Sequence, residues 1–347
     1  MLASAARPPA ASSGAPRPRA AVVLSRALRE EVFGPAAWAE LTGLVDLVTD
    51  CSDGADLVVH PLRGEVEVLV TSWGAPPLTA GLLAELPRLR TVLHAAGSVR
   101  RIATDALWER GITVVSAADA NNEPVAEYVY AQTVLALKDV HRRSRRIVAD
   151  RALPPLDGVP GIREQTVGLV SFGSVARKTA QRLHRLDARI LAWDPYLDDD
   201  AFRAEGVTRV AELSELAARS RVLSIHTPLI AGRTEDLVGE DLLRLLPPWA
   251  TLINTARGAV IDEAALLRVL VERPDLFAVL DVTRAEPPEP ESALYALPNV
   301  LLTGHVAGTV GTERRAMGRL VVDELRRLAA GLLPLHAVPA ASAHLRA

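Results

Sequence analysis

Three polar side chains follow predicted strands in the second half of the chain: Arg257, Glu286 and His305. An arginine binds a carboxylate through two parallel hydrogen bonds. A histidine can pass a proton to a carbonyl oxygen, and a carboxylate beside it keeps the ring oriented. These are the side-chain types that reduction of a 2-keto acid needs. Taken singly, each is better explained as a surface arginine, an acidic loop residue or a core histidine, so only the joint arrangement indicates the chemistry.

A second constellation is a turn of the dinucleotide-binding type. Residues 166–176 read TVGLVSFGSVA, an apolar run that leads into small residues and then a helical pattern. The fingerprint is G-x-G-x-x-G/A, and here it reads S-x-G-x-x-A, with Ser171 first and Gly173 central. The central glycine lets the backbone approach a pyrophosphate at the helix N-terminus. Because Ser171 departs from the pattern, we expect a weakened affinity or an altered turn. The residues of this turn predicted to bind the cofactor are Ser171, Gly173, Ser174 and Val175.

An acid follows the next predicted strand. Asp194 lies about 20 residues past Gly173, where an acidic side chain binds the ribose 2′-hydroxyl and repels a 2′-phosphate. This favours NAD over NADP as the cofactor. The alternative is that Asp194 and the proline after it simply make a turn.

The elements that must position these residues alternate along the chain. Short apolar runs separated by helical patterns predict an α/β fold with parallel sheets whose helices cover both faces. A break in the middle suggests two such units. The predicted strands are Ala21–Leu24, Val66–Val70, Thr91–Leu93, Ile112–Val115, Thr166–Val170, Arg189–Trp193, Val222–Ile225, Thr251–Asn254, Phe277–Asp281 and Val300–Thr303.

The break itself is a predicted long helix, Glu127–Ala149, followed by a Pro- and Gly-rich stretch at 151–163. The helix carries a basic stretch, His141–Arg146, which we interpret as a solvated face; a partner site is the alternative. Residues 1–20 contain no acid and four prolines, which favours a disordered tail over a transit peptide.

Composition bounds the function further. The chain has 347 residues, 49% of them hydrophobic, and a net charge of −3, so about two domains with real cores are expected. The near-neutral charge argues against nucleic acid or an anionic membrane as a partner. A single cysteine, Cys51, excludes an internal disulfide and a cysteine zinc cluster, and it fits a cytoplasmic protein. No metal ligand set is predicted.

Several spaced blocks carry a family resemblance. LINTARGAVIDE at 252–263, LDVTRAEP at 280–287 and LPNVLLTGHVAG at 297–308 resemble the signature blocks of the D-isomer-specific 2-hydroxyacid dehydrogenases. HTP at 226–228 and NNEPVAE at 121–127 are also similar to family blocks. Blocks in the right order are far more specific than the glycine turn alone.

The resemblance implies roles for individual residues. Arg257 would bind the substrate carboxylate, and His305 would be the general acid/base with Glu286 as its partner. The backbone of Ala96, Gly97 and Ser98 is similar to the family's carboxylate-binding turn. Trp73 and Arg100 are predicted to shape the substrate pocket, although a core tryptophan and a solvated arginine are at least as plausible. The remaining residues expected at the cofactor are His226, Thr227, Pro228, Ala256, Asp281 and Gly308.

The resemblance also implies an organisation. Residues 21–125 with 312–347 would form a flavodoxin-like substrate-binding domain, and 126–311 an NAD-binding domain, with the active site in the cleft between them. One further departure is Gly304, which stands where the family usually has proline and which we expect to loosen the turn before His305.

The expected function is therefore hydride transfer between NAD(H) and a small 2-keto or 2-hydroxy acid, most naturally reduction of the keto acid. The substrate stays open among glyoxylate, hydroxypyruvate and other 2-keto acids. The alternative is an NAD(H)-binding, corepressor-like regulator with little turnover, because such relatives keep the same three residues. A homodimer through the NAD domain is implied only by the family.

Overall fold

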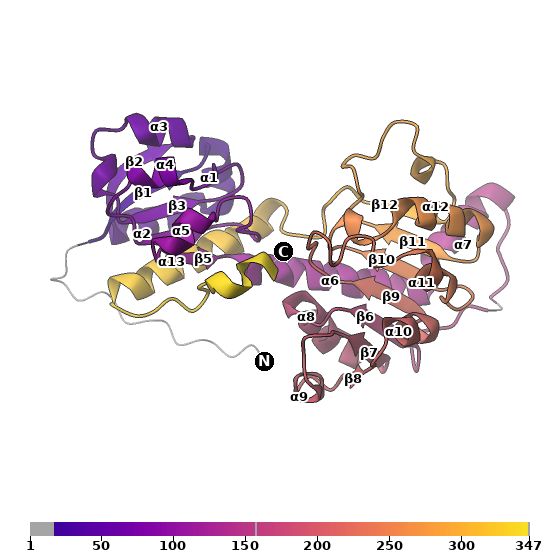
Figure 1. Cartoon of the computed structure of the whole chain (residues 1–347). Coiled ribbons are helices and arrows are strands. Elements are labelled where there is room, and N and C mark those ends of the chain that lie inside the picture. Colours follow the sequence, from indigo (N-terminus) through magenta and orange to yellow (C-terminus); the bar gives the residue numbers. More distant parts are fainter. Residues whose placement is uncertain (1–16, 157, 346–347) are drawn as a thin grey trace. The chain divides into compact units, whose positions relative to one another are not determined.

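The structure, a computed structural model, describes residues 17–156 and 158–345. Most of the predicted tail lies outside the described residues, and the first strand begins at Arg19. The chain divides into two compact units (Figure 1). Unit 1 comprises the described residues of Met1–Asn121 and Thr309–Ala347, and unit 2 comprises those of Asn122–Gly308. Each unit is built around its own parallel sheet.

Unit 1 contains a five-stranded sheet in the order β2-β1-β3-β4-β5, with every pair parallel. This 2-1-3-4-5 order is that of flavodoxin-like folds. The strands are β1 (Arg19–Val23), β2 (Asp46–Cys51), β3 (Val68–Thr71), β4 (Thr91–His94) and β5 (Thr113–Ser116). The helices of unit 1 are α1 (Arg26–Val32), α2 (Gly34–Leu44), α3 (Gly54–Val59), α4 (Ala80–Ala84), α5 (Asp105–Glu109) and α13 (Arg314–Ala329).

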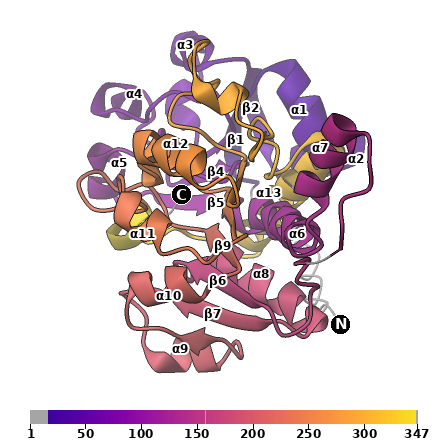
Figure 2. The same cartoon turned by 90° about the vertical axis from the view of Figure 1, so that its right-hand side faces the viewer.

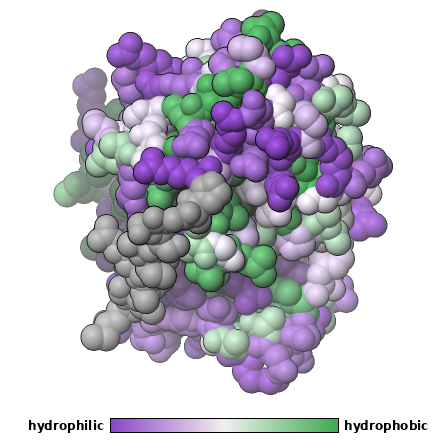
Figure 3. All heavy atoms as spheres, turned by 90° about the vertical axis from the view of Figure 1, so that its left-hand side faces the viewer, coloured by the Kyte–Doolittle hydropathy of each residue, from purple (hydrophilic) through white to green (hydrophobic). Residues whose placement is uncertain are grey.

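Helices cover both faces of the unit 1 sheet. Successive strand residues point to opposite faces, and here the residues on both faces are apolar and need a helix layer to bury them. Leu57 of α3, Leu83 of α4 and Leu107 of α5 pack on one face. Helices α1, α2 and α13 pack on the other. Gly318 of α13 is required there, since a Cβ would lie 2.2 Å from the carbonyl oxygen of Val32. The face of unit 1 seen in Figure 3 carries hydrophilic and hydrophobic side chains in small alternating patches.

Unit 2 contains a seven-stranded parallel sheet in the order β12-β11-β10-β9-β6-β7-β8. Renumbered from β6, this is the Rossmann order with one added strand, and its switch point lies between β6 and β9. The strands are β6 (Thr166–Val170), β7 (Arg189–Trp193), β8 (Thr208–Arg209), β9 (Val222–Ile225), β10 (Thr251–Asn254), β11 (Phe277–Leu280) and β12 (Val300–Leu302). The helices are α6 (Ala118–Leu137), α7 (Val140–Asp150), α8 (Ser174–Leu183), α9 (Asp199–Arg203), α10 (Leu213–Arg219), α11 (Glu240–Arg244) and α12 (Glu263–Glu272).

The unit 2 sheet is also covered on both faces, with α10, α11 and α12 on one side and α6 and α8 on the other (Figure 2). Adjacent residues of β6 show the alternation: Val170 packs with α10 and Leu169 with α8. The predicted fold class of two doubly wound parallel sheets is confirmed.

The prediction of one long helix at Glu127–Ala149 is wrong. Two helices, α6 and α7, meet at Asp139, whose φ of 54° is left-handed and ends the helical path. Aspartate tolerates this conformation better than most residues. The Asp139 carboxylate also accepts a hydrogen bond from Arg142 at 2.7 Å, which ties the break to the first turn of α7.

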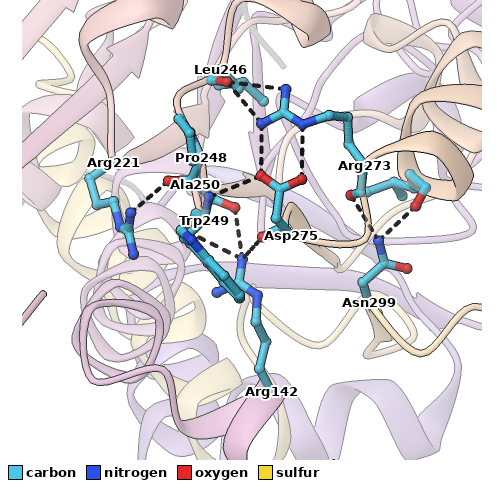
Figure 4. Close-up of polar contacts among 10 residues, drawn as sticks. Arg142, Arg221, Leu246, Pro248, Trp249, Ala250, Arg273, Asp275 and Asn299 are labelled. Atoms are coloured by element: carbon cyan, nitrogen blue, oxygen red, sulfur yellow. Dashed lines mark hydrogen bonds and ion pairs between the residues drawn. The ribbon is translucent and has the colours of Figure 1, made fainter. Parts of the chain in front are cut away.

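The basic stretch on α7 is not a solvated face throughout. The Arg142 guanidinium donates to the main-chain oxygens of Ala250 and Asp275, each at 2.9 Å (Figure 4). Arg145 donates to the main-chain oxygens of Leu297, Pro298 and Val300. Arg142 therefore binds the amino ends of β10 and β11, and Arg145 binds the amino end of β12. The solvated-face and partner-site interpretations are therefore wrong for these two side chains, which hold the sheet edge in place.

Candidate active site

The carboxyl edge of the unit 2 sheet brings the predicted catalytic residues together. Arg257 follows β10, Glu286 follows β11 and His305 follows β12. These strands are neighbours and parallel, so their following loops lie at the same edge. Ligands bind at this edge in open α/β sheets.

His305 and Glu286 form a direct pair. His305 Nδ1 lies 2.7 Å from Glu286 Oε2, and the two side chains are 52% and 41% exposed. Because the carboxylate occupies Nδ1, Nε2 is the ring nitrogen that remains for chemistry. The arrangement matches a proton donor oriented through its second nitrogen.

The turn that carries His305 is left-handed at two successive residues. Gly304 has a φ of 70° and His305 a φ of 61°. Proline fixes φ near −65° and cannot adopt this path. Gly304 therefore sets a turn that proline would forbid, a larger change than the loosening expected from the sequence.

Asp281 holds that turn from beneath. Its side chain is 2% exposed, and Oδ1 accepts from Val306 N at 2.8 Å while Oδ2 accepts from Ala307 N at 3.0 Å. The main-chain oxygen of Asp281 accepts from His305 N at 2.6 Å. Both carboxylate oxygens of Asp281 thus accept hydrogen bonds from the loop. Contact of Asp281 with a nicotinamide stays a prediction.

The Arg257 loop is fixed by its neighbours. Buried Asn254 donates from Nδ2 to the Arg257 main-chain oxygen at 3.0 Å and accepts from Ala256 N at 3.0 Å. At Gly258 a Cβ would lie 2.0 Å from the carbonyl carbon of Thr283. Gly258 therefore allows the Arg257 loop to pack directly against the backbone that leads to Glu286. Sequence reasoning assigned no role to Asn254 or Gly258, although both stand inside the block 252–263.

The glycine turn follows β6 and contains the predicted departure. Ser171 has a φ of 67°, the left-handed region that favours glycine. Its hydroxyl lies 2.8 Å from Thr227 Oγ1, and Thr227 in turn donates to the Val170 main-chain oxygen at 3.3 Å. The serine thus keeps the glycine-like backbone and adds a contact to the residue after His226.

Asp194 lies against the same turn. Its Oδ2 accepts from Phe172 N at 2.9 Å and its Oδ1 accepts from Tyr196 N at 2.9 Å. The carboxylate therefore stands at the end of β7, beside the turn and next to the switch point. This is the place where an acid faces the adenosine ribose in dinucleotide-binding sheets.

The donor set at this edge fits a dinucleotide. Helix α8 begins at an N-cap glycine, Gly173, which provides no side-chain cap, and a Cβ there would meet open space. Among the described residues, several buried polar atoms have no hydrogen-bond partner. They include both ring nitrogens of His226 and the hydroxyl of Thr255. Burial lowers the pKa of His226 to about 3, so its ring is neutral. Unpartnered polar atoms at the ends of β9 and β10 are what a polar cofactor would satisfy.

Unit 1 contains the turn that was predicted to bind a carboxylate. Ala96, Gly97 and Ser98 follow β4, and the Ser116 hydroxyl donates to the Gly97 main-chain oxygen at 2.6 Å. A Cβ on Gly97 would lie 3.3 Å from Asn121 Nδ2, so that position is tight.

Arg100 and Trp73 are the two residues of unit 1 predicted to shape the pocket. The Arg100 N–H donates to Ser98 Oγ at 3.4 Å. Trp73 is 43% exposed, and the Arg314 guanidinium lies 5.3 Å from the centre of its ring. The interpretation of Trp73 as a core residue is therefore wrong.

Comparisons with known proteins agree with this architecture. The sequence pattern described as D-isomer specific 2-hydroxyacid dehydrogenase, NAD binding domain, matches residues 130–307. The chain is 33% identical over 248 residues to an (S)-sulfolactate dehydrogenase of Chromohalobacter salexigens, covering 71% of this chain and 79% of that one. It is 30% identical over 295 residues to a glyoxylate reductase of Korarchaeum cryptofilum, covering 84% and 83%.

One solved structure is similar to this chain over nearly the whole length of both proteins. The NADPH-dependent glyoxylate/hydroxypyruvate reductase of Sinorhizobium meliloti superposes with a TM-score of 0.73 at 28% identity, covering 95% of this chain and 100% of that one. The chain spans about half (51%) of the length of a similar D-3-phosphoglycerate dehydrogenase from Methanocaldococcus jannaschii.

Within residues 17–156 and 158–345, no group of three or more His, Cys, Asp or Glu side chains is arranged to hold a metal ion. In the same part of the chain, no helix has the length and apolarity needed to cross a bilayer.

Proposed function

Because the chain belongs to the D-isomer-specific 2-hydroxyacid dehydrogenase family, we propose that it reduces a small 2-keto acid with NADH. It is an oxidoreductase that acts with a nicotinamide cofactor. The observation that carries the proposal is the His305–Glu286 pair beside the Arg257 loop at the carboxyl edge of the unit 2 sheet. The relatives named above are dehydrogenases and reductases, and nothing in them favours the regulatory alternative.

The roles of the three residues follow from their chemistry. Arg257 binds the substrate carboxylate and orients the carbonyl. Protonated His305 donates its Nε2 proton to the carbonyl oxygen, while Glu286 holds Nδ1 and stabilises the charged ring. When bound, the nicotinamide supplies the hydride that C2 accepts. Arg257 and His305 together stabilise the negative charge that develops on the oxygen.

The proposed cofactor preference rests on Asp194. Its carboxylate at the end of β7 favours a free ribose 2′-hydroxyl and repels a 2′-phosphate. Cofactor contacts are proposed for Ser171, Gly173, Ser174, Val175, Asp194, His226, Thr227, Pro228, Ala256, Asp281 and Gly308.

In unit 1, we propose that the Gly97 and Ser98 amides help to bind the substrate carboxylate. Ala96 belongs to the same turn, and Trp73 and Arg100 are proposed to shape the pocket. Exposed Trp73 supplies apolar area, and Arg100 supplies a positive charge that a second anionic group would use.

We also propose a cytoplasmic homodimer that forms through unit 2. Five large apolar side chains are exposed on α7 and just after it: Val140, Ile147, Val148, Leu153 and Leu156. For such an apolar surface, contact with a second copy of the chain is more favourable than contact with water. Sedimentation measurements on the wild type and on Val148→Glu test this; a wild-type monomer would contradict it.

The test of the function is NADH oxidation with a panel of glyoxylate, hydroxypyruvate, pyruvate, phenylpyruvate, oxaloacetate and sulfopyruvate, with NADPH in parallel. Turnover of one or two members with NADH supports the proposal and identifies the pocket as small, aromatic or doubly anionic. NADH binding without turnover of any member would contradict the proposed substrate class. A preference for NADPH would overturn the role of Asp194.

A further inference from the structure

A chain of hydrogen bonds connects helix α6 to the turn that carries His305. The Tyr128 hydroxyl of α6 lies 2.9 Å from Thr303 Oγ1, across 175 residues of sequence. Thr303 donates to Asp281 Oδ1 at 2.7 Å. Asp281 is the buried carboxylate that binds the N–H groups of Val306 and Ala307. Tyr128 therefore connects α6 to the residues on either side of His305.

The direction of each hydrogen bond in this chain is determined. Thr303 has one proton, and it is used on Asp281. Thr303 must therefore accept from Tyr128, which makes the tyrosine a donor at this contact. A phenylalanine would fill the same space but leave Thr303 without its donor.

Helices α6 and α7 are joined by a second side-chain contact. Gln132 Oε1 lies 2.9 Å from His141 Nε2. An amide oxygen can only accept, so His141 carries its proton on Nε2 and donates it to Gln132. Burial, together with Arg145 and Arg142, lowers the pKa of His141, which agrees with a neutral ring.

The turn needs such support. Gly304 and His305 are both left-handed, and an L-residue keeps this conformation only where its surroundings over-determine it. Leu280, Asp281 and Glu286, on β11 and the loop after it, also form hydrogen bonds with residues 303–307. Tyr128 links the turn to helix α6, and this contact is partly buried.

We propose that Tyr128 is a positioning residue that holds His305 in its productive conformation by acting through Thr303 and Asp281. The inference rests on the proposed function of His305 as proton donor. Without the Tyr128 hydroxyl, the 303–307 turn visits other backbone conformations, and the Glu286–His305 pair is populated for less of the time. The proton-transfer step slows, whereas binding of cofactor and keto acid changes little.

The first experiment compares Tyr128→Phe with Tyr130→Phe, a control two residues along the same helix that packs on the hydrophobic core of unit 2. Amide hydrogen exchange is measured over 303–307 in the cofactor-free protein, and kcat and KM are measured with the substrate that the panel identifies. Tyr128→Phe is expected to exchange about 3- to 10-fold faster and to lose kcat by a similar factor, at unchanged KM. Wild-type exchange and kcat in Tyr128→Phe would overturn the proposal, as would an equal effect in Tyr130→Phe.

A second set of variants tests the route through Thr303. Thr303→Val removes the hydroxyl, and Thr303→Ser is expected to recover most of the lost kcat. The double variant Tyr128→Phe/Thr303→Val should be no slower than Thr303→Val alone, because both changes break one chain. Independent, multiplying losses would contradict the route. Since hydrogen exchange needs no substrate, a protein that turns over no keto acid would refute the proposed function without deciding the exchange result.

Discussion

The Ser171 hydroxyl lies 2.8 Å from Thr227 Oγ1, so the residue that replaces the first fingerprint glycine joins the ends of β6 and β9 across the switch point. A serine at a φ of 67° carries a conformational cost that glycine does not. The hydrogen bond to Thr227 offsets that cost. At Ser171, the conformational cost of replacing the glycine is therefore offset by the hydrogen bond that the serine side chain gains.

This balance predicts different effects for two replacements of Ser171. Ser171→Ala keeps the left-handed cost and loses the hydrogen bond, so we expect a loss of about 1–2 kcal/mol in the free energy of unfolding. Ser171→Gly loses the bond but relieves the strain, so its stability should stay within about 1 kcal/mol of wild type. Urea denaturation measures both. Glycine at least as destabilising as alanine would contradict the argument.

The catalytic assignment predicts a division of kinetic effects. His305→Ala should lower kcat by about 10²- to 10⁴-fold with little change in KM, because it removes the proton donor. Arg257→Lys should lower kcat/KM for the keto acid, since lysine keeps the charge but lacks the planar fork. Steady-state kinetics with varied keto acid separate the two. Near-wild-type turnover in His305→Ala would remove the acid–base assignment.

Gly258 predicts a severe effect from one methyl group. A Cβ at this position would lie 2.0 Å from the backbone of Thr283, so Gly258→Ala must push apart the loops that carry Arg257 and Glu286. We expect at least about 3 kcal/mol of destabilisation, the upper range for overpacking. Gly43→Ala in α2 is the control, because its Cβ enters open space and should stabilise the helix by up to about 1 kcal/mol. A harmless Gly258→Ala, judged by thermal unfolding, would show that these loops are not packed as described.

The sequence predicted the strands that are buried on both faces, and several of their limits agree to the residue, such as Thr166–Val170 and Thr251–Asn254. It missed β2 and β8, which lie at sheet edges. The β2 residues are mostly exposed or half-exposed, so no continuous apolar run marks that strand. The break between α6 and α7 depends on one left-handed residue, Asp139, which periodicity cannot reveal.

For the candidate active site too, the sequence revealed local features but not contacts that depend on the fold. The residue types and blocks indicated Arg257, Glu286 and His305, because strand ends and motifs are local features. Tyr128 and Thr303 are 175 residues apart, and neither stands out by type or spacing. Their contact exists only because the fold brings α6 beside the end of β12.

Arg142 predicts a large loss from a residue that looked like a surface charge. Its side chain is 9% exposed and bonds Asp139 and the main-chain oxygens of Ala250 and Asp275. Arg142→Met removes these hydrogen bonds and takes the buried guanidinium away from the Asp139 carboxylate, which should cost about 3–5 kcal/mol. Arg146→Met on the same helix, at a side chain that is 56% exposed, should change stability by less than about 0.5 kcal/mol. Equal effects of the two variants in urea denaturation would refute the structural role of Arg142.

The His336–Glu324 pair predicts a pH dependence of stability in unit 1. Glu324 is almost fully buried and accepts from the N–H groups of Leu335 and His336 and from His336 Nδ1. The hydrogen bond to Glu324 raises the pKa of His336, against the opposing effect of burial. Burial alone would raise the pKa of Glu324, but the hydrogen bonds from His336 and the Leu335 N–H together hold it below its usual value.

The sign of the effect follows from these two shifts. The raised pKa of His336 gives stability that is complete below its ordinary value of 6.5 and is lost as pH rises through the folded-state value. The lowered pKa of Glu324 gives stability that is present above its ordinary value of 4.5 and is lost as pH falls through the folded-state value. The pair should therefore stabilise most between these two ordinary values. Replacing either partner should cost about 1 kcal/mol there, a modest figure because His336 is partly exposed.

Urea denaturation of wild type, His336→Asn and Glu324→Gln between about pH 4 and 9 tests this window. The wild-type advantage over His336→Asn should be largest near the middle of the window and should shrink toward alkaline pH, where the imidazole is neutral in both folded and unfolded protein. The double variant should lose less than the two single losses combined, because the partners share one interaction. An advantage that is constant with pH, or that grows on the alkaline side, would show that the ion pair does not hold His336 against α13.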